Sequence, residues 1–474
     1  LFFMLHVAAF FAMLAGMIRG PLAWRTYLAW SSGASFLIAL FPAFQLAFPG
    51  FFFDPAAERF SGTVGNPIFL AAYLLFHVFI AGHLAFESRA RGQRTLAALF
   101  GVIALFDAGV IAMTQTRGAL AGLVAGLAVL SVFYAVRPFG TDIVPPPRGR
   151  AAIAAAWTAL FLLSSFFYAT RAHPAWSSVP VFGRLSAQGL QAAPRLMAWR
   201  IGLVSFADRP LFGWGFENSS VGFNAHYDPR LLRYGSGEIA FDKPHNAFVQ
   251  ALAETGILGF AAYAAFFAIL LWRSRRAPWL IALLAAYLVQ DFFAFDTVTS
   301  YVMLAVIAAY AASYDLPDAH RALSGSAPNI PFAVLCIFAF AALAYFPYYP
   351  VWRASHAEWT AINEFVQKRI PEGMAAFFDV LSVRTPYIAY VRKDLAPMIG
   401  QMHRQNIALP DLRATIARAA DELRAAIRDN PSNYAFLAGF AEFATTAYDV
   451  DASYLTEAEK VLADAEALSP RRQT

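Results

Sequence analysis

Long apolar segments separated by short polar turns occupy the first three quarters of the chain. A membrane-spanning helix requires about 20 mostly apolar residues. Ten runs approach this length, and Pro, Gly or charged residues bound most of them. They are residues 1–18, 28–49, 67–86, 96–114, 118–136, 151–169, 247–272, 278–295, 298–314 and 330–350. The pattern predicts an all-α, polytopic membrane helix bundle.

The arginines are distributed unevenly between the two sets of connecting loops. One set contains Arg19, Arg25, Arg89, Arg91, Arg94, Arg137, Arg148, Arg150, Arg273, Arg275, Arg276 and Arg321. The short loops of the other set contain only Arg59 and Arg117. Because cytoplasmic loops are enriched in Lys and Arg, the first set is predicted to be cytoplasmic. A large loop, residues 170–246, and the tail, residues 351–474, then lie on the outer side.

Composition excludes several other classes of protein. The chain is 59% hydrophobic and 14% charged, against about 45–50% and about 25% in soluble domains. A water-soluble enzyme and a disordered chain are therefore excluded, and the single cysteine, Cys336, cannot form an intramolecular disulfide. The net charge of +5 is attributed to cytoplasmic arginines rather than to nucleic-acid binding. Because Leu1 lies inside an apolar stretch without a basic leader, we interpret the start as truncated.

The tail is charged, rich in alanine and patterned as helices. A short pattern recurs there with the same offsets: Leu423, Ala426 and Pro431, then Leu462, Ala465 and Pro470, with a weaker copy at Phe378 and Pro386. Such helix pairs resemble tetratricopeptide repeats, although the copies are 45 and 39 residues apart rather than about 34. A plain helical hairpin domain is the alternative. In both interpretations the tail is expected to serve in binding, in packing or as a spacer, and not in catalysis. We therefore divide the chain into a transmembrane domain, 1–350, and a helical domain, 351–474.

The strongest local signal is Asp242-Lys243-Pro244-His245-Asn246, directly before an apolar run. Asp242 is predicted to cap a helix with Pro244 in its first turn, which places His245 in that turn at the outer surface. A helix N-terminus attracts phosphate oxygens, and a neutral imidazole can accept a proton from a sugar hydroxyl. The alternative is that His245 only caps the helix at the interface.

Asn246, Gln250 and Glu254 follow at intervals of four residues and are predicted to share one helix face. Because a polar stripe is costly in lipid, this face should be directed to protein or to a wet cavity. We assign the three residues a supporting role.

Arginines of the outer face are candidates for binding phosphate, because guanidinium groups match its geometry. Arg184, Arg195 and Arg200 lie in the large outer loop, and Arg117 lies in the turn Thr116-Arg117-Gly118. Arg195 and Arg200 are five residues apart, so one helix would not present both on the same face. Each of these arginines could instead contact lipid headgroups or snorkel to the interface.

Other polar positions have mainly structural interpretations. In Gly65-Asn66-Pro67 the asparagine is predicted to cap a helix that begins with the proline, and the glycines of residues 210–215 predict a turn. Asp107 and Asp291 lie in apolar runs and are functional candidates, Asp291 near the outer end, where water can reach it. No metal-ligand cluster, phosphate-binding loop or serine triad is found in the sequence, so no metal or other cofactor is predicted.

Taken together, these motifs resemble the O-antigen ligase and polymerase superfamily of bacterial envelope glycosyltransferases. The motifs are Gly65-Asn66-Pro67, Thr116-Arg117-Gly118, Arg195 four residues before Trp199, residues 208–215, and His245-Asn246 with Gln250, Glu254, Thr255 and Gly256. They occur in this order within residues 28–350. The family usually has Ser-Arg-Gly where this chain has Thr116-Arg117-Gly118.

The resemblance implies a metal-independent, inverting transferase of the bacterial inner membrane, with its active site facing the periplasm or the cell exterior. It implies that His245 is the catalytic histidine and that Arg195 and Arg184 hold a diphosphate. The expected donor is an undecaprenyl-diphosphate-linked glycan. The expected acceptor is lipid A core, a glycan or a protein hydroxyl. Family members have about 12 spans, so N-terminal spans are expected to be missing here.

Three other interpretations stay open. A polysaccharide polymerase or a protein O-oligosaccharyltransferase of the same superfamily would use the same donor chemistry with another acceptor. A transporter or lipid-glycan flippase would explain the spans and Asp107, but not the large outer loop with its histidine and arginines. In a membrane-anchored scaffold, the tail would be the functional part.

Overall fold

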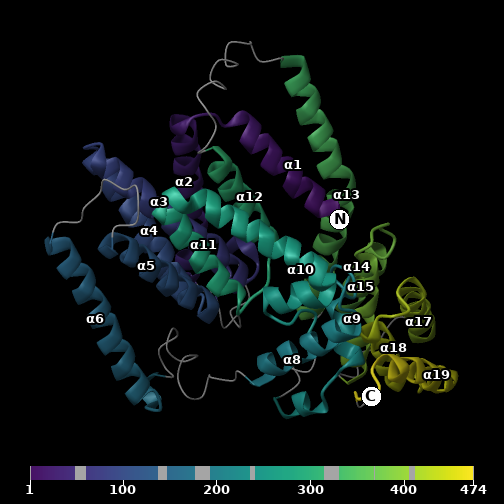
Figure 1. Cartoon of the computed structure of the whole chain (residues 1–474). Coiled ribbons are helices and arrows are strands. Elements are labelled where there is room, and N and C mark those ends of the chain that lie inside the picture. Colours follow the sequence, from purple (N-terminus) through teal and green to yellow (C-terminus); the bar gives the residue numbers. More distant parts are fainter. Residues whose placement is uncertain are drawn as a thin grey trace. The chain divides into compact units, whose positions relative to one another are not determined.

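The computed structural model describes residues 2–48, 60–136, 147–176, 193–234, 241–313, 330–367, 369–404 and 411–472. Every predicted apolar run overlaps a helix, although the helix of the run 278–295 ends at Asp291 (Figure 1). These helices are α1 (Phe2–Met17), α2 (Pro21–Ala47), α3 (Pro67–Ala90), α4 (Arg94–Met113), α5 (Arg117–Val136), α6 (Pro147–Thr170), α10 (Ala247–Arg273), α11 (Pro278–Asp291), α12 (Val298–Ser313) and α13 (Ile330–Val366). Six of them, α2 to α6 and α10, are long and apolar enough to cross a membrane, whereas α1, α11 and α12 are shorter apolar helices. Since none of the described residues forms a strand, the all-α, multi-pass membrane fold is confirmed.

The chain divides into two compact units. The first comprises Leu1–Ser219 and Phe241–Leu323, and the second comprises Ser220–Ala240 and Ser324–Thr474. The second unit thus includes a piece of the outer loop in addition to the tail. Helix α13 continues without a break past residue 350, the predicted boundary between the transmembrane domain and the helical domain. The division into domains 1–350 and 351–474 stays a prediction.

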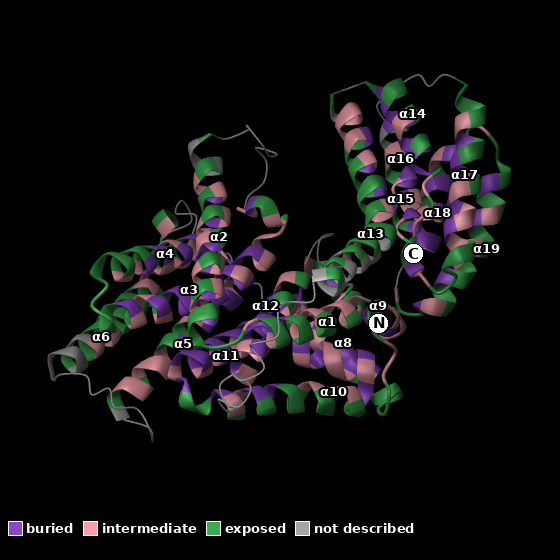
Figure 2. Cartoon of the chain, turned by 90° about the horizontal axis from the view of Figure 1, so that it is seen from above, coloured by how far each residue is buried: buried purple, intermediate pink, exposed green. Residues whose placement is uncertain are grey.

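The core of the first unit is built around α3. Its side chains are buried along most of its length (Figure 2), and α2, α4, α5 and α11 pack around it. Small residues set the contact between α5 and α11. A Cβ atom on Gly122 would lie 3.3 Å from the Ala286 carbonyl carbon, and one on Gly126 would lie 2.8 Å from the Ala286 Cβ. Glycines at intervals of four residues allow such close helix packing in a membrane.

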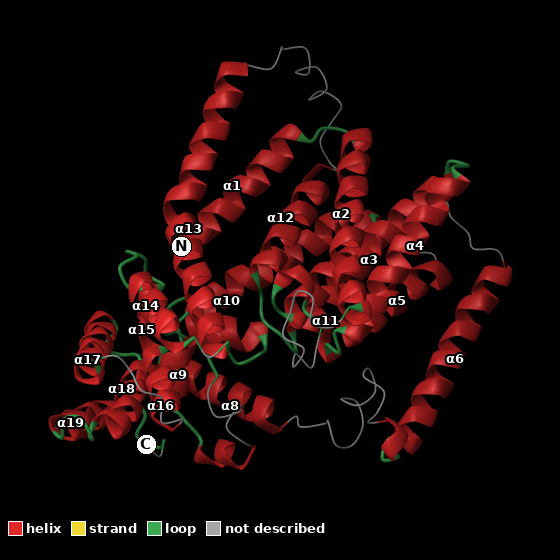
Figure 3. Cartoon of the chain, turned by 180° about the vertical axis from the view of Figure 1, so that it is seen from behind, coloured by secondary structure: helices red, strands yellow, loops and turns green. Residues whose placement is uncertain are grey.

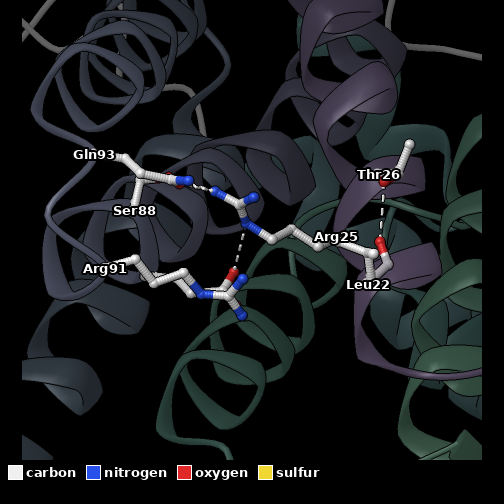
Figure 4. Close-up of polar contacts among 7 residues, drawn as sticks. Leu22, Arg25, Thr26, Ser88, Arg91 and Gln93 are labelled. Atoms are coloured by element: carbon white, nitrogen blue, oxygen red, sulfur yellow. Dashed lines mark hydrogen bonds and ion pairs between the residues drawn. The ribbon is translucent and has the colours of Figure 1, made fainter.

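A polar cluster connects the start of α2 to the end of α3 (Figure 4). The Arg25 guanidinium donates to the Ser88 hydroxyl at 3.0 Å and to the Gln93 side-chain oxygen at 2.6 Å. It also pairs with Glu87 at 3.4 Å, and Glu87 pairs with Arg91 at 2.6 Å. The loops that carry this cluster are those predicted to be cytoplasmic.

The described elements of the second unit are helices joined by turns and loops (Figure 3). Its elements are most of α9 (Ser219–Ala225), the 3-10 turn η4 (Pro229–Tyr234), α13, α14 (Ile370–Val380), α15 (Ile388–Lys393), α16 (Leu395–Arg404), α17 (Leu412–Asp429), α18 (Tyr434–Ala447) and α19 (Ser453–Leu468). Aromatic side chains such as Phe377, Phe440 and Phe443 fill its core.

The recurring pattern of the tail has a clear packing basis. Ala426 and Ala465 are fully buried near the ends of α17 and α19, and a proline follows each helix two residues after its last residue. This arrangement agrees with both interpretations of the tail, so the likeness to tetratricopeptide repeats stays a prediction.

Candidate active site

Helix α10 begins at Ala247, and Asn246 is its cap. The Asn246 side-chain oxygen accepts from the backbone N–H groups of Phe248 and Val249, both at 3.0 Å. The predicted cap at Asp242 is therefore wrong, and His245 lies before the helix rather than in its first turn. The backbone of His245 adopts a left-handed conformation with φ of 54°. Because this conformation interrupts helical geometry, the helix starts only after it.

The His245 ring has a defined orientation. Its Nδ1 atom lies 3.0 Å from the carbonyl oxygen of Lys243. Since a carbonyl oxygen only accepts, Nδ1 is the donor of this contact, and in a neutral ring the lone pair is then on Nε2. The rings of Phe241 and Phe295 meet it edge-on, with centroids 5.7 and 5.2 Å away. The lone pair that a general base requires is thus on Nε2.

The residues between α11 and α12, 292–297, form an aromatic loop on which the predicted motifs converge. Phe295 contacts His245 and also Phe69, whose helix starts at Asn66-Pro67, with ring centroids 6.2 Å apart. The predicted cap is confirmed there, because the Asn66 side chain accepts from the N–H of Ile68 at 2.8 Å.

The other phenylalanines of this loop contact two further motifs. Phe292 packs on Trp199 of α8 (Ala193–Asp208), with centroids 5.1 Å apart. A Cβ atom on Gly118, at the start of α5, would lie 3.1 Å from the Phe293 Cβ. The aromatic loop thus lies against the described motifs of α3, α5 and α8 and against His245, and the sequence pattern did not predict it.

A lysine beside the histidine was also missed. The Lys243 ammonium pairs with Glu217 at 2.9 Å and lies 5.2 Å from the centroid of the Phe295 ring. Lys243 directly follows Asp242 and is two residues before His245, so the motif that identified the histidine already contained it.

Two carboxyl groups lie at the ends of the aromatic loop. Asp291 is fully buried, so the expectation that water reaches it is wrong. The Tyr263 hydroxyl lies 3.5 Å from Asp291 Oδ2 and 3.2 Å from Asp296 Oδ2, and the Tyr287 hydroxyl donates to Asp296. Burial raises the pKa of the Asp296 carboxyl, while the two tyrosine donors act in the opposite direction. Asp107, the other intramembrane carboxylate, accepts from the Ser35 hydroxyl at 2.9 Å.

Glu254 joins α10 to the outer loop. One oxygen accepts from the Ser219 hydroxyl at 2.6 Å and from the Gln250 amide at 3.1 Å, and the other accepts from the N–H of Glu217 at 3.0 Å. Glu254 is only 2% exposed. The polar stripe at Gln250 and Glu254 is thus directed to protein, as its spacing predicts.

The glycine-rich segment 210–215 pairs with the backbone of α10. The N–H groups of Trp214 and Gly215 donate to the carbonyls of Ala253 and Glu254 at 2.9 and 2.8 Å. A Cβ atom on Gly213 would lie 2.6 Å from the Thr255 nitrogen, so only glycine allows this approach. The predicted turn therefore serves to attach the end of α8 to α10.

The arginine candidates have different surroundings. Arg195 is half-buried one turn before Trp199, whereas Arg200 is exposed, which agrees with their predicted opposite faces. Arg117 is the first residue of α5 and is half-buried. Arg184 lies outside the described residues. A Cβ atom on Gly202 would lie 2.6 Å from a Val249 methyl group, so α8, which carries Arg195, packs on the start of α10.

The match to known families agrees with this geometry. Residues 100–264 match the O-antigen ligase family, and this range contains the turn at Arg117, the Arg195 helix, the glycine-rich segment and His245. No curated protein matches the chain. The fold thus defines the class of multi-pass, all-α membrane proteins. Within that class, residues 100–264 are similar to the O-antigen ligase family, which agrees with the resemblance seen in the sequence.

The Glu254 contacts lead to a prediction of stability. Glu254→Ala leaves donors of Ser219, Glu217 and Gln250 without their acceptor, so we expect the free energy of unfolding to fall by about 3 kcal/mol. Thermal unfolding of the purified protein would measure this. Glu217→Gln is the control: its carboxylate is 54% exposed, so its loss should cost about 0–1 kcal/mol. An unchanged melting temperature for Glu254→Ala would contradict the role given to this carboxylate.

Proposed function

We propose that the protein transfers a glycan from an undecaprenyl-diphosphate carrier to an acceptor hydroxyl at the periplasmic face of the bacterial inner membrane. The observation that carries the proposal is the contact between His245 Nδ1 and the Lys243 carbonyl oxygen at 3.0 Å. Because the carbonyl accepts from Nδ1, the lone pair of the neutral imidazole would be on Nε2. The packing of the same ring on the aromatic loop, where the family's motifs meet, supports the assignment.

In the proposed mechanism, the arginines bind the diphosphate and compensate the charge that develops on it as it leaves. Arg195 and Arg117 are the described candidates, and Arg184 is a further candidate from the sequence. Because Asn246 already occupies two N–H groups of α10, the helix contributes mainly its dipole to this binding.

His245 Nε2 then accepts the proton of the acceptor hydroxyl. The hydroxyl oxygen forms the new bond to the anomeric carbon, and the bond from that carbon to the diphosphate breaks on the opposite face. The configuration is therefore inverted. We expect no metal requirement, since guanidinium groups supply the positive charge that Mg²⁺ supplies in other phosphate chemistry.

The proposal can be tested with purified protein, a lipid-linked glycan donor and candidate acceptors in detergent, without any gradient. Formation of a glycosylated acceptor supports transfer, whereas a flippase would form no product. Mass analysis of the envelope glycans in a strain that lacks the protein separates the finer alternatives. Accumulated full-length lipid-linked chains would indicate a ligase, and accumulated single repeat units would indicate a polymerase.

Arg195 and Arg200 form a matched pair for testing the diphosphate site. We expect Arg195→Ala to raise the KM for the donor by about tenfold or more, because a charge-assisted contact to phosphate is lost. Arg200→Ala removes the same charge from the exposed face of the same helix and should change the KM by less than about twofold. Initial rates at varied donor concentration measure both. The reverse ranking would move the site to the other face of α8.

A further inference from the structure

The segment Ser220–Ala240 belongs to the second unit, although its neighbours on both sides along the chain belong to the first. Ser219, directly before it, donates to Glu254 at 2.6 Å. Phe241, directly after it, packs its ring on His245. The segment therefore connects two residues of the candidate site, while its own packing partners lie in the second unit.

Within the second unit, the segment is anchored by buried side chains. Tyr227 and Leu231 are 0% exposed, and Phe223 is 6% exposed. The rings of Phe223 and Tyr227 meet edge-on with centroids 6.0 Å apart. A loop that only crossed a surface would leave such residues in solvent, so this segment is a packed part of the unit.

The end of the chain holds this segment. The Arg472 guanidinium carbon lies 4.8 Å from the centroid of the Tyr227 ring and 4.4 Å from that of Tyr434 on α18. Arg472 also donates to the Asn224 side-chain oxygen at 3.1 Å, and the buried Ser469 hydroxyl donates to the Asn224 carbonyl at 2.8 Å. The guanidinium thus contacts one ring of the outer loop and one ring of the tail, an arrangement stabilised by cation–π attraction.

We propose that Arg472 is a positioning residue for glycan transfer. Together with Ser469, Arg472 holds the segment Ser220–Ala240 and so restricts its motion. The residues at the two ends of this segment, Ser219 and Phe241, contact Glu254 and His245 of the candidate site. A loop fixed at its middle has fewer conformations to lose when substrate binds, and such preorganisation lowers the cost of binding. This inference rests on the proposed function, and it gives the tail a part in the reaction.

Limited trypsin digestion of the full-length protein tests the contact without an activity assay. Arg230 and Arg233 are exposed cleavage sites within the segment. In Arg472→Ala, we expect cleavage at these sites to be faster by about tenfold, because the segment opens more often. Mass spectrometry identifies the cut, and Arg471→Ala, which changes the exposed neighbour, should digest like the wild type. Asn224→Ala should add little to Arg472→Ala, since both remove the same hydrogen bond.

The transfer assay tests the positioning role. We expect Arg472→Ala to lower kcat/KM by about tenfold, mainly through KM, because the released loop has more conformations to lose when substrate binds. Arg472→Lys keeps the charge but not the planar group, and should restore part of the loss. Arg471→Ala should be unchanged.

Two results would overturn the inference: digestion of Arg472→Ala at the wild-type rate, or faster digestion with unchanged kcat and KM. Absence of transfer by the wild-type protein would instead contradict the proposed function. In that event the digestion would still show whether Arg472 holds the segment.

Discussion

His245→Ala is expected to lower the rate of glycan transfer by about 10² to 10⁴-fold, the range for losing a general base. Its Nε2 lone pair is the proposed acceptor of the hydroxyl proton, and no other group of the site receives that role. The rate should fall at saturating donor, because the imidazole acts in the transition state rather than in binding. Turnover by the purified variant with a lipid-linked donor measures the effect.

An exposed histidine of the outer face gives the control. His173 lies next to the short 3-10 turn at Pro174–Trp176, and His173→Ala should transfer at the wild-type rate. Thermal unfolding of both variants shows whether lost activity reflects lost folding. Undiminished turnover by a folded His245→Ala protein would remove this histidine from the mechanism.

Gly256→Ala should destabilise the protein by about 3 kcal/mol or more and abolish most transfer. Gly256 has a φ of 64°, and its Cβ would lie 2.6 Å from the Phe212 nitrogen, close against the backbone of the glycine-rich segment. The N–H of Ile257 donates to the Pro210 carbonyl at 2.8 Å directly beside it. The added methyl group would therefore separate this segment from α10. Thermal unfolding and the transfer assay measure the two effects.

Two other glycines separate the causes of that loss. Gly65 also has a positive φ, 79°, but nothing lies within 4 Å of its Cβ position, so Gly65→Ala should cost only about 1 kcal/mol of backbone strain. Gly82 lies within α3 with open space around it, and Gly82→Ala should be neutral. If Gly256→Ala behaved like Gly65→Ala, the close backbone contact would not be what holds the segment.

Hydropathy predicted the positions of the apolar helices because lipid leaves few alternatives for an apolar run. Of the ten predicted spans, six are long and apolar enough in the described part of the chain to cross a membrane. The same property hid the aromatic loop. Phe292, Phe293 and Phe295 extend the apolar run of residues 278–295, so hydropathy assigned them to a span, yet α11 ends at Asp291. Phe292 and Phe293 contact Trp199 but stay partly exposed, and Phe295 contacts Phe69 and His245. Hydrophobicity alone does not distinguish a lipid neighbour from a protein neighbour.

The start of α10 shows a second limit of sequence reasoning. Asp242 and Asn246 are both good capping residues, and Pro244 favours a helix that begins early. Which of the two residues caps the helix depends on the left-handed backbone of His245. The ring of this histidine also contacts Phe241 and Phe295. Such contacts join positions far apart in the sequence, so the local pattern placed the start of the helix too early.

The assignment of Ser220–Ala240 to the second unit sets a rule for exchanging parts between relatives of this protein. A chimaera that receives only a foreign tail would place Tyr227 against residues that did not evolve with it. Ser220–Ala240 and the tail should therefore be transplanted together as one module. In the gene, the coding sequence of several membrane helices separates these two parts.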